Sequence, residues 1–242
     1  MICRLMFAGF CEVPRPWYTA LCEGVNRLYY IHGGTGGYRA DGYHKQFMTG
    51  MLYLLPFFSK VIPYTDEHDR LVHTYANFEL IPPIISREPL VLDPKESPET
   101  EAVLNTFLVL SKKAAGKMLA GEEGRMLTAS IEYLVSRAIA ASGTSLLDDP
   151  TLNKALGIMN DRMRDGLGIA DIAKECYMST DGFIRKFTRV VGSTPYAYYK
   201  RLKLRTALAM RESGYTLEAA AEACGYSDAS ALLHAIAKEK TK

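Results

Sequence analysis

A passage near the C-terminal end of the chain occurs nearly twice. Residues 166–179 have the sequence GLGIADIAKECYMS, and residues 214–227, at a spacing of 48, have GYTLEAAAEACGYS. Each copy predicts a short amphipathic helix and a tight turn, followed by a serine, Ser179 or Ser227, that can cap a second helix. This layout is a helix-turn-helix, whose second helix can enter the major groove of DNA. The repeat therefore predicts two such units joined by one helix.

The charge is divided unevenly along the chain. Residues 1–150 contain 14 Lys and Arg against 17 Asp and Glu, a net charge of −3. Residues 151–242 contain 15 against 10, a net charge of +5, although the whole chain carries only +2. The positive excess lies in the half that contains the repeat, as expected of a nucleic-acid-binding domain attached to a neutral sensor or scaffold.

The composition is typical of a globular protein from a reducing compartment. With 242 residues, 48% of them hydrophobic, the chain is long enough for two domains with their own cores. Its five cysteines include no C-x-x-C pair, which disfavours a disulfide framework. No apolar run reaches transmembrane length, and the stretch MICRLMFAGFC lacks a signal-peptide cleavage pattern. We therefore expect a cytoplasmic protein with no membrane partner.

The first third of the chain has short, aromatic-rich segments separated by turn residues. Strands are predicted at 27–32, 46–50, 51–56 and 71–80, with turns at 33–37, 41–44 and 63–69. Five prolines between Pro82 and Pro98 are expected to end the sheet. Short strands in this arrangement are typical of a small antiparallel barrel, to which we assign residues 1–94.

Residues 95–141 are predicted to be helical. Ser97 or Thr100 can cap a first helix. A second helix spans roughly 122–141 and has an apolar stripe at Met126, Leu127, Ile131, Leu134, Val135 and Ala138. This stripe can pack against the chain's own barrel or form a dimer interface, and one helix can do both. Residues 142–150 are interpreted as a linker, which places an all-α domain at 151–242.

The helix after Ser179 is the predicted DNA-reading helix of the first copy. Apolar residues at helical spacing form its inner face: Phe183, Phe187 and Val190. The candidate DNA-binding residues are Ser179, Thr180, Asp181, Ile184, Arg185, Lys186 and Arg189. Arg185 is the best candidate for a bidentate contact to guanine, and Ile184 for contact with a thymine methyl. A connector helix from Tyr196 to about Glu212 follows.

These residues resemble the DNA-binding domain of AraC/XylS-type transcription regulators. The first copy fits I-A-D-I-A-x-x-C-x-M-S-x-x-x-F-x-R-x-F, followed by G-x-T-P-x-x-Y and a basic helix, and the second contains E-A-A-A-E-A-C-G-Y-S-D-A-S. The resemblance implies a ligand-responsive regulator that binds double-stranded promoter DNA and a small-molecule effector such as a sugar. It also implies a homodimer without a cofactor, and contact with RNA polymerase if the protein is an activator, which is the family's commoner role.

The second copy departs from the family pattern. Leu232, His234 and Ile236 stand where the family usually has Phe, Arg and Phe, and Lys203 replaces a connector arginine. The sequence also ends at Lys242, short of the family's last segment. A histidine that is mostly neutral at pH 7 is a weaker groove contact than arginine. The candidate DNA-binding residues of this copy, from which we expect a smaller contribution, are Ala229, Ser230, Leu233 and His234.

The predicted barrel resembles cupins, many of which are metal enzymes. A metal-binding cupin usually has an H-x-H pair, whereas His32, His44, His68 and His73 are scattered. We therefore expect neither a metal nor catalytic residues. A loose match to the sensor barrels of the regulator family implies that Tyr64, His73 and Tyr75 bind the effector, with Trp17 on an arm over the mouth. The alternative is that Tyr64, His73 and Tyr75 are barrel core.

The main prediction is an α+β protein that regulates transcription. A cupin-like antiparallel β-barrel with helices would be followed by an all-α domain of two helix-turn-helix units joined by a connector helix. Two other functions stay open. A cupin-type metal enzyme could carry the repeat as a DNA-binding tail, and would need a bound metal. A regulator with a degenerate second copy could bind only half of an operator.

Overall fold

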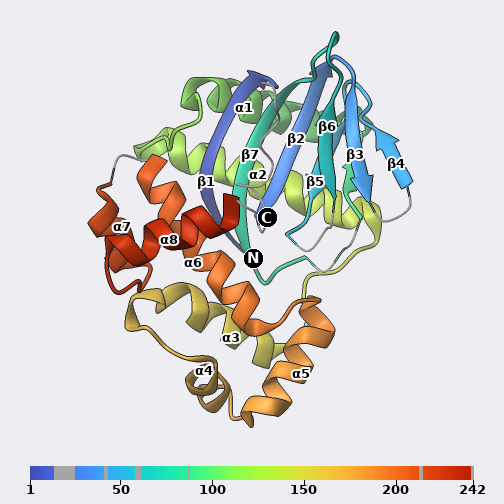
Figure 1. The fold of residues 1–242 in the computed structure, drawn as a ribbon. Coiled ribbons are helices and arrows are strands. Elements are labelled where there is room, and N and C mark those ends of the chain that lie inside the picture. Colours follow the sequence, from blue (N-terminus) through green and yellow to red (C-terminus); the bar gives the residue numbers. More distant parts are fainter. Residues whose placement is uncertain are drawn as a thin grey trace. The chain divides into compact units, whose positions relative to one another are not determined.

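The computed structural model describes residues 1–13, 25–40, 43–57, 61–84, 86, 88–212 and 215–240. Contacts among them divide the chain into an N-terminal body that ends at Leu146 and a C-terminal body that begins at Leu147 (Figure 1). The boundary falls inside the segment 142–150 that the sequence predicts as a linker. No helix in these described ranges is long and apolar enough to cross a lipid bilayer.

The N-terminal body contains two antiparallel sheets, as the sequence predicts. The larger sheet has the strand order β1-β7-β2-β5-β8, and the smaller has β4-β3-β6. The larger contains β1 (Ile2–Glu12), β2 (Asn26–Gly33), β5 (Leu52–Leu55), β7 (Val72–Ile81) and β8 (Leu90–Leu92). The smaller contains β3 (Gly36–Ala40), β4 (Tyr43–Gln46) and β6 (Ile62–Thr65). Buried side chains of both sheets share a core that includes Tyr29, Ile31, Tyr38, Phe47, Tyr53 and Leu71.

The sequence located only part of these strands. The predictions at 27–32, 51–56 and 71–80 are confirmed by β2, β5 and β7, whereas the strand at 46–50 is wrong because Gln46 ends β4. Segments interpreted as turns instead contribute to β3, β4 and β6. Gly37 gives the physical reason, since an added Cβ there would lie 2.1 Å from the Lys45 carbonyl oxygen. This glycine permits two strands to approach each other closely rather than the chain to turn.

Two strands at the edges of the larger sheet were not predicted. β1 pairs with β7 from Ile2↔Ile81 to Glu12↔Val72. β8 pairs with β5 through Leu52↔Leu92 and Leu54↔Leu90, so the prolines after Ile81 do not end the sheet. Pro89 directly precedes β8, a position where a proline costs no ladder hydrogen bond.

Two helices pack on the larger sheet. α1 (Pro98–Ala114) and α2 (Gly121–Ser142) follow a short 3₁₀ turn, η2 (Pro94–Glu96), and Figure 1 shows α2 crossing behind the strands. Ser97 is the N-cap of α1, and its side chain accepts a hydrogen bond from the Thr100 backbone N–H at 3.3 Å. The first of the two predicted caps is therefore the one that the structure uses.

The apolar stripe of α2 packs against the chain's own sheet. Its members Leu127, Ile131, Leu134, Val135 and Ala138 are 0% exposed and share a core with Leu28, Leu54 and Phe78 of the strands. Met126, in contrast, is 48% exposed. The structure thus uses the stripe for packing within the chain, and dimerisation through α2 stays a prediction.

The C-terminal body is all-α. It contains α3 (Pro150–Asp161), α4 (Ile169–Glu175), α5 (Thr180–Val191), α6 (Pro195–Glu212), α7 (Leu217–Ala223) and α8 (Ala229–Lys240), with a 3₁₀ turn η3 (Met163–Asp165) after α3. We call α4 and α5 the first unit and α7 and α8 the second unit. The connector helix predicted at 196–212 is confirmed within one residue by α6, and the short helix predicted in each copy is present as α4 and α7. α3 was not predicted.

The turns of the two units have the same backbone geometry. Tyr177 has φ 57° and Gly225 has φ 64°, and these left-handed residues lie 48 positions apart. The next residue closes each turn in the same way: Met178 N–H donates to the Ala173 carbonyl, and Tyr226 N–H to the Ala221 carbonyl, both at 2.9 Å. The repeat seen in the sequence is therefore a repeat of structure up to this point.

Beyond the turn the spacing becomes 49. α5 begins one residue after its N-cap Ser179, whose side chain accepts from the Gly182 N–H at 3.2 Å. In the second unit the corresponding contact is made by Asp228, which accepts from the Ala231 N–H at 2.8 Å. The predicted cap Ser227 is therefore wrong. Asp228, Leu232 and Ile236 correspond to Ser179, Phe183 and Phe187, which places His234 opposite Arg185.

Candidate functional site

The inner face of α5 anchors the helix firmly in the C-terminal body. Phe183 and Phe187 are 0% exposed, and their ring centroids are 5.5 Å apart. Phe187 also meets Tyr198 of α6 edge to face, with centroids 5.5 Å apart. Val191, rather than the predicted Val190, is the third buried member of this face. A helix held in this way can present its opposite face in a fixed orientation.

The outer face of α5 carries most of the predicted DNA-binding side chains. Thr180, Asp181, Arg185 and Arg189 are exposed, and Ile184 is half-buried beside them. Asp181, Arg185 and Arg189 follow one another at intervals of four, so they lie along one side of the helix. Ser179 is exposed at the start of the helix but is engaged as its cap.

Lys186 lies apart from this outer face. Its ammonium forms an ion pair at 2.9 Å with the Asp149 carboxylate, and the two side chains are only 28% and 19% exposed. Asp149 is also the N-cap of α3, where it accepts from the Leu152 N–H at 3.1 Å. Burial opposes ionisation of Asp149, but hydrogen bonds from Lys186 and Leu152 outweigh it, and the pKa of this carboxyl is lowered. Lys186 therefore connects α5 to α3.

Replacing Asp149 is expected to loosen that connection. We expect Asp149→Ala to lower the free energy of unfolding by about 1–2 kcal/mol, as for other lost N-caps, and Asp149→Asn to cost less because it retains a capping oxygen. Because the folded-state pKa is depressed, the contribution is present above the unfolded pKa and is lost as the pH falls through the folded value. Urea denaturation from pH 7 downwards measures it. An Asp149→Ala effect as large at pH 2 as at pH 7 would contradict the ion-pair account.

The outer face of α8 is different. Ser230, Leu233 and His234 are exposed, Ala229 is half-buried, and Leu233 retains 52% of its surface. Leu232 is 0% exposed in the core of the second unit, against which Ile236 packs. On α8, Leu232 and Ile236 thus occupy the inner positions that the two phenylalanines occupy on α5. Residues 229–240 include no arginine, so this face has no guanidinium that could make a bidentate contact to guanine.

Contacts through η3 and α6 fix the second unit within the C-terminal body. Arg164 of η3 forms an ion pair with Glu222 of α7. Lys203 of α6 lies 4.6 Å above the Tyr199 ring, and its ammonium approaches the Gly225 carbonyl at 3.5 Å. Burial lowers the pKa of Lys203. This residue, which departs from the family's arginine, supports the turn of the second unit.

The predicted effector residues are spread over the N-terminal body. His73 and Tyr75 are near neighbours in β7, with ring centroids 5.5 Å apart, and His73 is 3% exposed. Burial, and next the nearby His32, lower the pKa of His73 to about 3. Tyr64 lies in β6, where the Arg39 guanidinium is 5.1 Å from its ring centroid. Trp17 lies outside the described residues. His73 packs among Tyr29 and Tyr75 as part of the aromatic interior.

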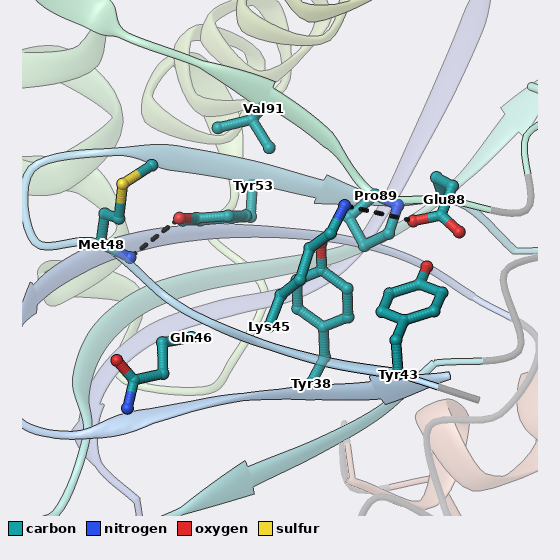
Figure 2. A pocket seen from close by; sticks show the side chains of 9 residues that line it. All are labelled: Tyr38, Tyr43, Lys45, Gln46, Met48, Tyr53, Glu88, Pro89 and Val91. Atoms are coloured by element: carbon teal, nitrogen blue, oxygen red, sulfur yellow. Dashed lines mark hydrogen bonds and ion pairs between the residues drawn. The ribbon is translucent and has the colours of Figure 1, made fainter. Parts of the chain in front are cut away.

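A pocket opens elsewhere, between the β3–β4 hairpin and the edge formed by β5 and β8 (Figure 2). It has a volume of about 390 Å³ and is lined by Tyr38, Tyr43, Lys45, Gln46, Met48, Tyr53, Glu88, Pro89 and Val91. None of these residues was predicted from the sequence, because β3, β4 and β8 were not recognised as strands. The only feature of the sequence that could have indicated this pocket is the density of tyrosines among these residues. Within the described ranges no group of three or more His, Cys, Asp or Glu side chains could hold a metal ion.

Comparisons with known proteins agree with this architecture. Residues 172–241 match the family described as a helix-turn-helix domain. Among solved structures, apo ToxT from Vibrio cholerae has a TM-score of 0.61 at 10% identity, covering 98% of this chain and 89% of that one. ToxT from the same organism with a bound unsaturated fatty acid has a TM-score of 0.62 at 9% identity, covering 98% and 87%. No curated protein sequence matches the chain.

The matched domain contains the second helix-turn-helix unit, the connector and most of the first. The C-terminal body therefore contains a helix-turn-helix domain. The order of two units around α6 is the one that the resemblance to AraC/XylS-type regulators implies, and the chain has a fold similar to that of ToxT.

Proposed function

We propose that the protein binds promoter DNA chiefly through α5 and that a small organic effector bound to the N-terminal body controls this binding. In this proposal the effector binds to residues 1–94, and the helices of residues 95–141 support that barrel. A linker at residues 142–150 connects it to the DNA-binding domain, residues 151–242. One observation carries it: α5 combines a fully buried phenylalanine pair with exposed Arg185 and Arg189, whereas α8 offers Leu233 and His234. The charged helix α5 is therefore the better candidate to bind in a groove of DNA.

An effector-binding role has support from the fold. Solved structures of ToxT include one bound to an unsaturated fatty acid and one bound to (E)-4-(8-methylnaphthalen-1-yl)but-3-enoic acid. The N-terminal body of this chain contains a pocket of about 390 Å³, within the size range of small-molecule sites. The effector would act by binding one arrangement of the DNA-binding domain more tightly than another. We further propose that the protein acts in the cytoplasm as a homodimeric activator that contacts RNA polymerase.

Selection of bound sequences from a random DNA pool by the full chain, followed by footprinting, tests the reading of DNA. We expect one strongly protected segment of about 10 base pairs for each chain, the span of one helical turn of duplex, and only weak protection one turn away. Failure to enrich any sequence would overturn the proposal. Equal protection of two adjacent turns would show instead that both units read DNA alike.

A further inference from the structure

The tyrosine-lined pocket has a chemistry that identifies a class of ligand, and this inference rests on the proposed sensing role. Three phenol side chains, Tyr38, Tyr43 and Tyr53, come from β3, β4 and β5 (Figure 2). Burial, followed by the charge of Glu88, raises the pKa of Tyr38 to about 12. Proximity to the Glu88 carboxylate, which can accept a hydrogen bond from its hydroxyl, raises the pKa of Tyr43 to about 12. These rings therefore stay neutral at physiological pH.

The pocket contains one cation and one anion of its own. The Lys45 ammonium lies 5.3 Å from the centroid of the Tyr43 ring and 3.9 Å from a Glu88 carboxylate oxygen. Figure 2 shows Lys45 extending along the tyrosines towards Glu88. An ammonium is thus accommodated between an aromatic face and a carboxylate, which are the two features that favour a positive charge. The location of the Lys45 ammonium therefore indicates that this position is favourable for a cation.

The interactions that hold the Lys45 ammonium between Tyr43 and Glu88 are weak. At 3.9 Å its ammonium is beyond hydrogen-bond distance from Glu88, and the two side chains are 60% and 52% exposed. Exposed ion pairs of this kind contribute little to stability. A ligand's ammonium could therefore take the place of the Lys45 head group, which would turn out into solvent on its flexible stem at small cost.

We propose that this pocket binds a small organic ammonium ion, with Glu88 and the tyrosine rings holding the charged group. Met48, Pro89 and Val91 provide an apolar wall for the organic substituent. The Tyr53 hydroxyl accepts a hydrogen bond from the Met48 N–H at 2.8 Å, so its own proton is free to meet a polar group of the ligand. A carboxylate ligand would use Lys45 instead and would be repelled by Glu88, so the two classes predict opposite effects of substitution.

Calorimetric titration of the full chain can distinguish the classes with three probes of similar size: phenethylammonium, 3-phenylpropionate and 3-phenylpropan-1-ol. We expect only phenethylammonium to bind measurably. Glu88→Gln should weaken its binding about tenfold, as for a lost charge-assisted contact. Lys45→Met should strengthen it about threefold, since the competing ammonium is gone. Tyr43→Leu, which removes the ring under the cation, should weaken it.

Lys95→Met and Glu96→Gln are matched controls, because both residues are exposed on η2 and do not line the pocket. They should leave phenethylammonium binding unchanged. Preferential binding of 3-phenylpropionate with its loss in Lys45→Met, or no binding of any probe to a chain that still binds its selected DNA, would overturn the ammonium site. Probe binding with the expected signs by a chain that binds no DNA would support the site and refute the regulatory role instead.

Discussion

Arg185→Ala is expected to weaken specific DNA binding by about ten- to hundredfold, the value of one bidentate contact to guanine. Arg185 is exposed on α5, while the phenylalanines on the opposite face hold that helix rigid. Because Arg185 is exposed, the loss should appear in binding and not in thermal stability. Gel-shift titration against the selected sequence and against an unrelated duplex measures both specific and non-specific affinity.

The corresponding residue of the second unit provides the matched control. His234 occupies the same position on α8 and is exposed, but an imidazole lacks the planar, five-donor guanidinium of arginine. We expect His234→Ala to reduce specific affinity by less than about threefold, because no bidentate contact is lost. Arg185→Lys separates two roles for the arginine, since a lysine retains the charge for a phosphate but not the planar fork. Equal losses in Arg185→Ala and His234→Ala would refute the ranking of the two units.

The helical half of this protein could be predicted closely from its sequence. Amphipathic periodicity and local caps determine where α4, α5 and α6 begin, and these signals lie within a few residues of one another. The cap at Ser179 is an example, since its partner is the backbone of Gly182. The cap predicted at Ser227 is wrong because the second copy has one more residue between its turn and its second helix. The burial of Leu232 and the packing of Ile236 agree with this change of register.

The sheet and the pocket could not be predicted to the same degree. β1 and β7 pair across more than 60 residues of sequence in Cys11↔His73 and Phe10↔Thr74, and no local pattern specifies such a partner. Lys45, in β4, and Glu88, just before β8, are also brought together only by the fold, because they are far apart in the sequence. The predicted effector residue His73 was a reasonable choice from chemistry alone, yet the fold surrounds it with aromatic rings.

The second large effect is expected at Gly225, in the turn of the second unit. Its φ of +64° is unfavourable for any residue with a side chain, and an added Cβ would lie 2.1 Å from the Met163 carbonyl oxygen. That oxygen belongs to the backbone of η3, which the Arg164–Glu222 ion pair holds against α7. Left-handed strain of roughly 1–2 kcal/mol and a backbone clash of similar size should together cost about 3 kcal/mol in Gly225→Ala.

Gly192→Ala separates the two contributions. Gly192 has φ +76° but nothing within 4 Å of an added Cβ, so its replacement should cost only the strain, about 1 kcal/mol. Hydrogen exchange followed by mass spectrometry on peptides from 217–240 is the suitable measurement, because it reports the second unit separately from the N-terminal body. We expect Gly225→Ala to lose protection across α7 and α8 while α5 retains its own. Equal effects of the two substitutions would mean that η3 moves aside, and that its contact with the turn does not hold the second unit in place.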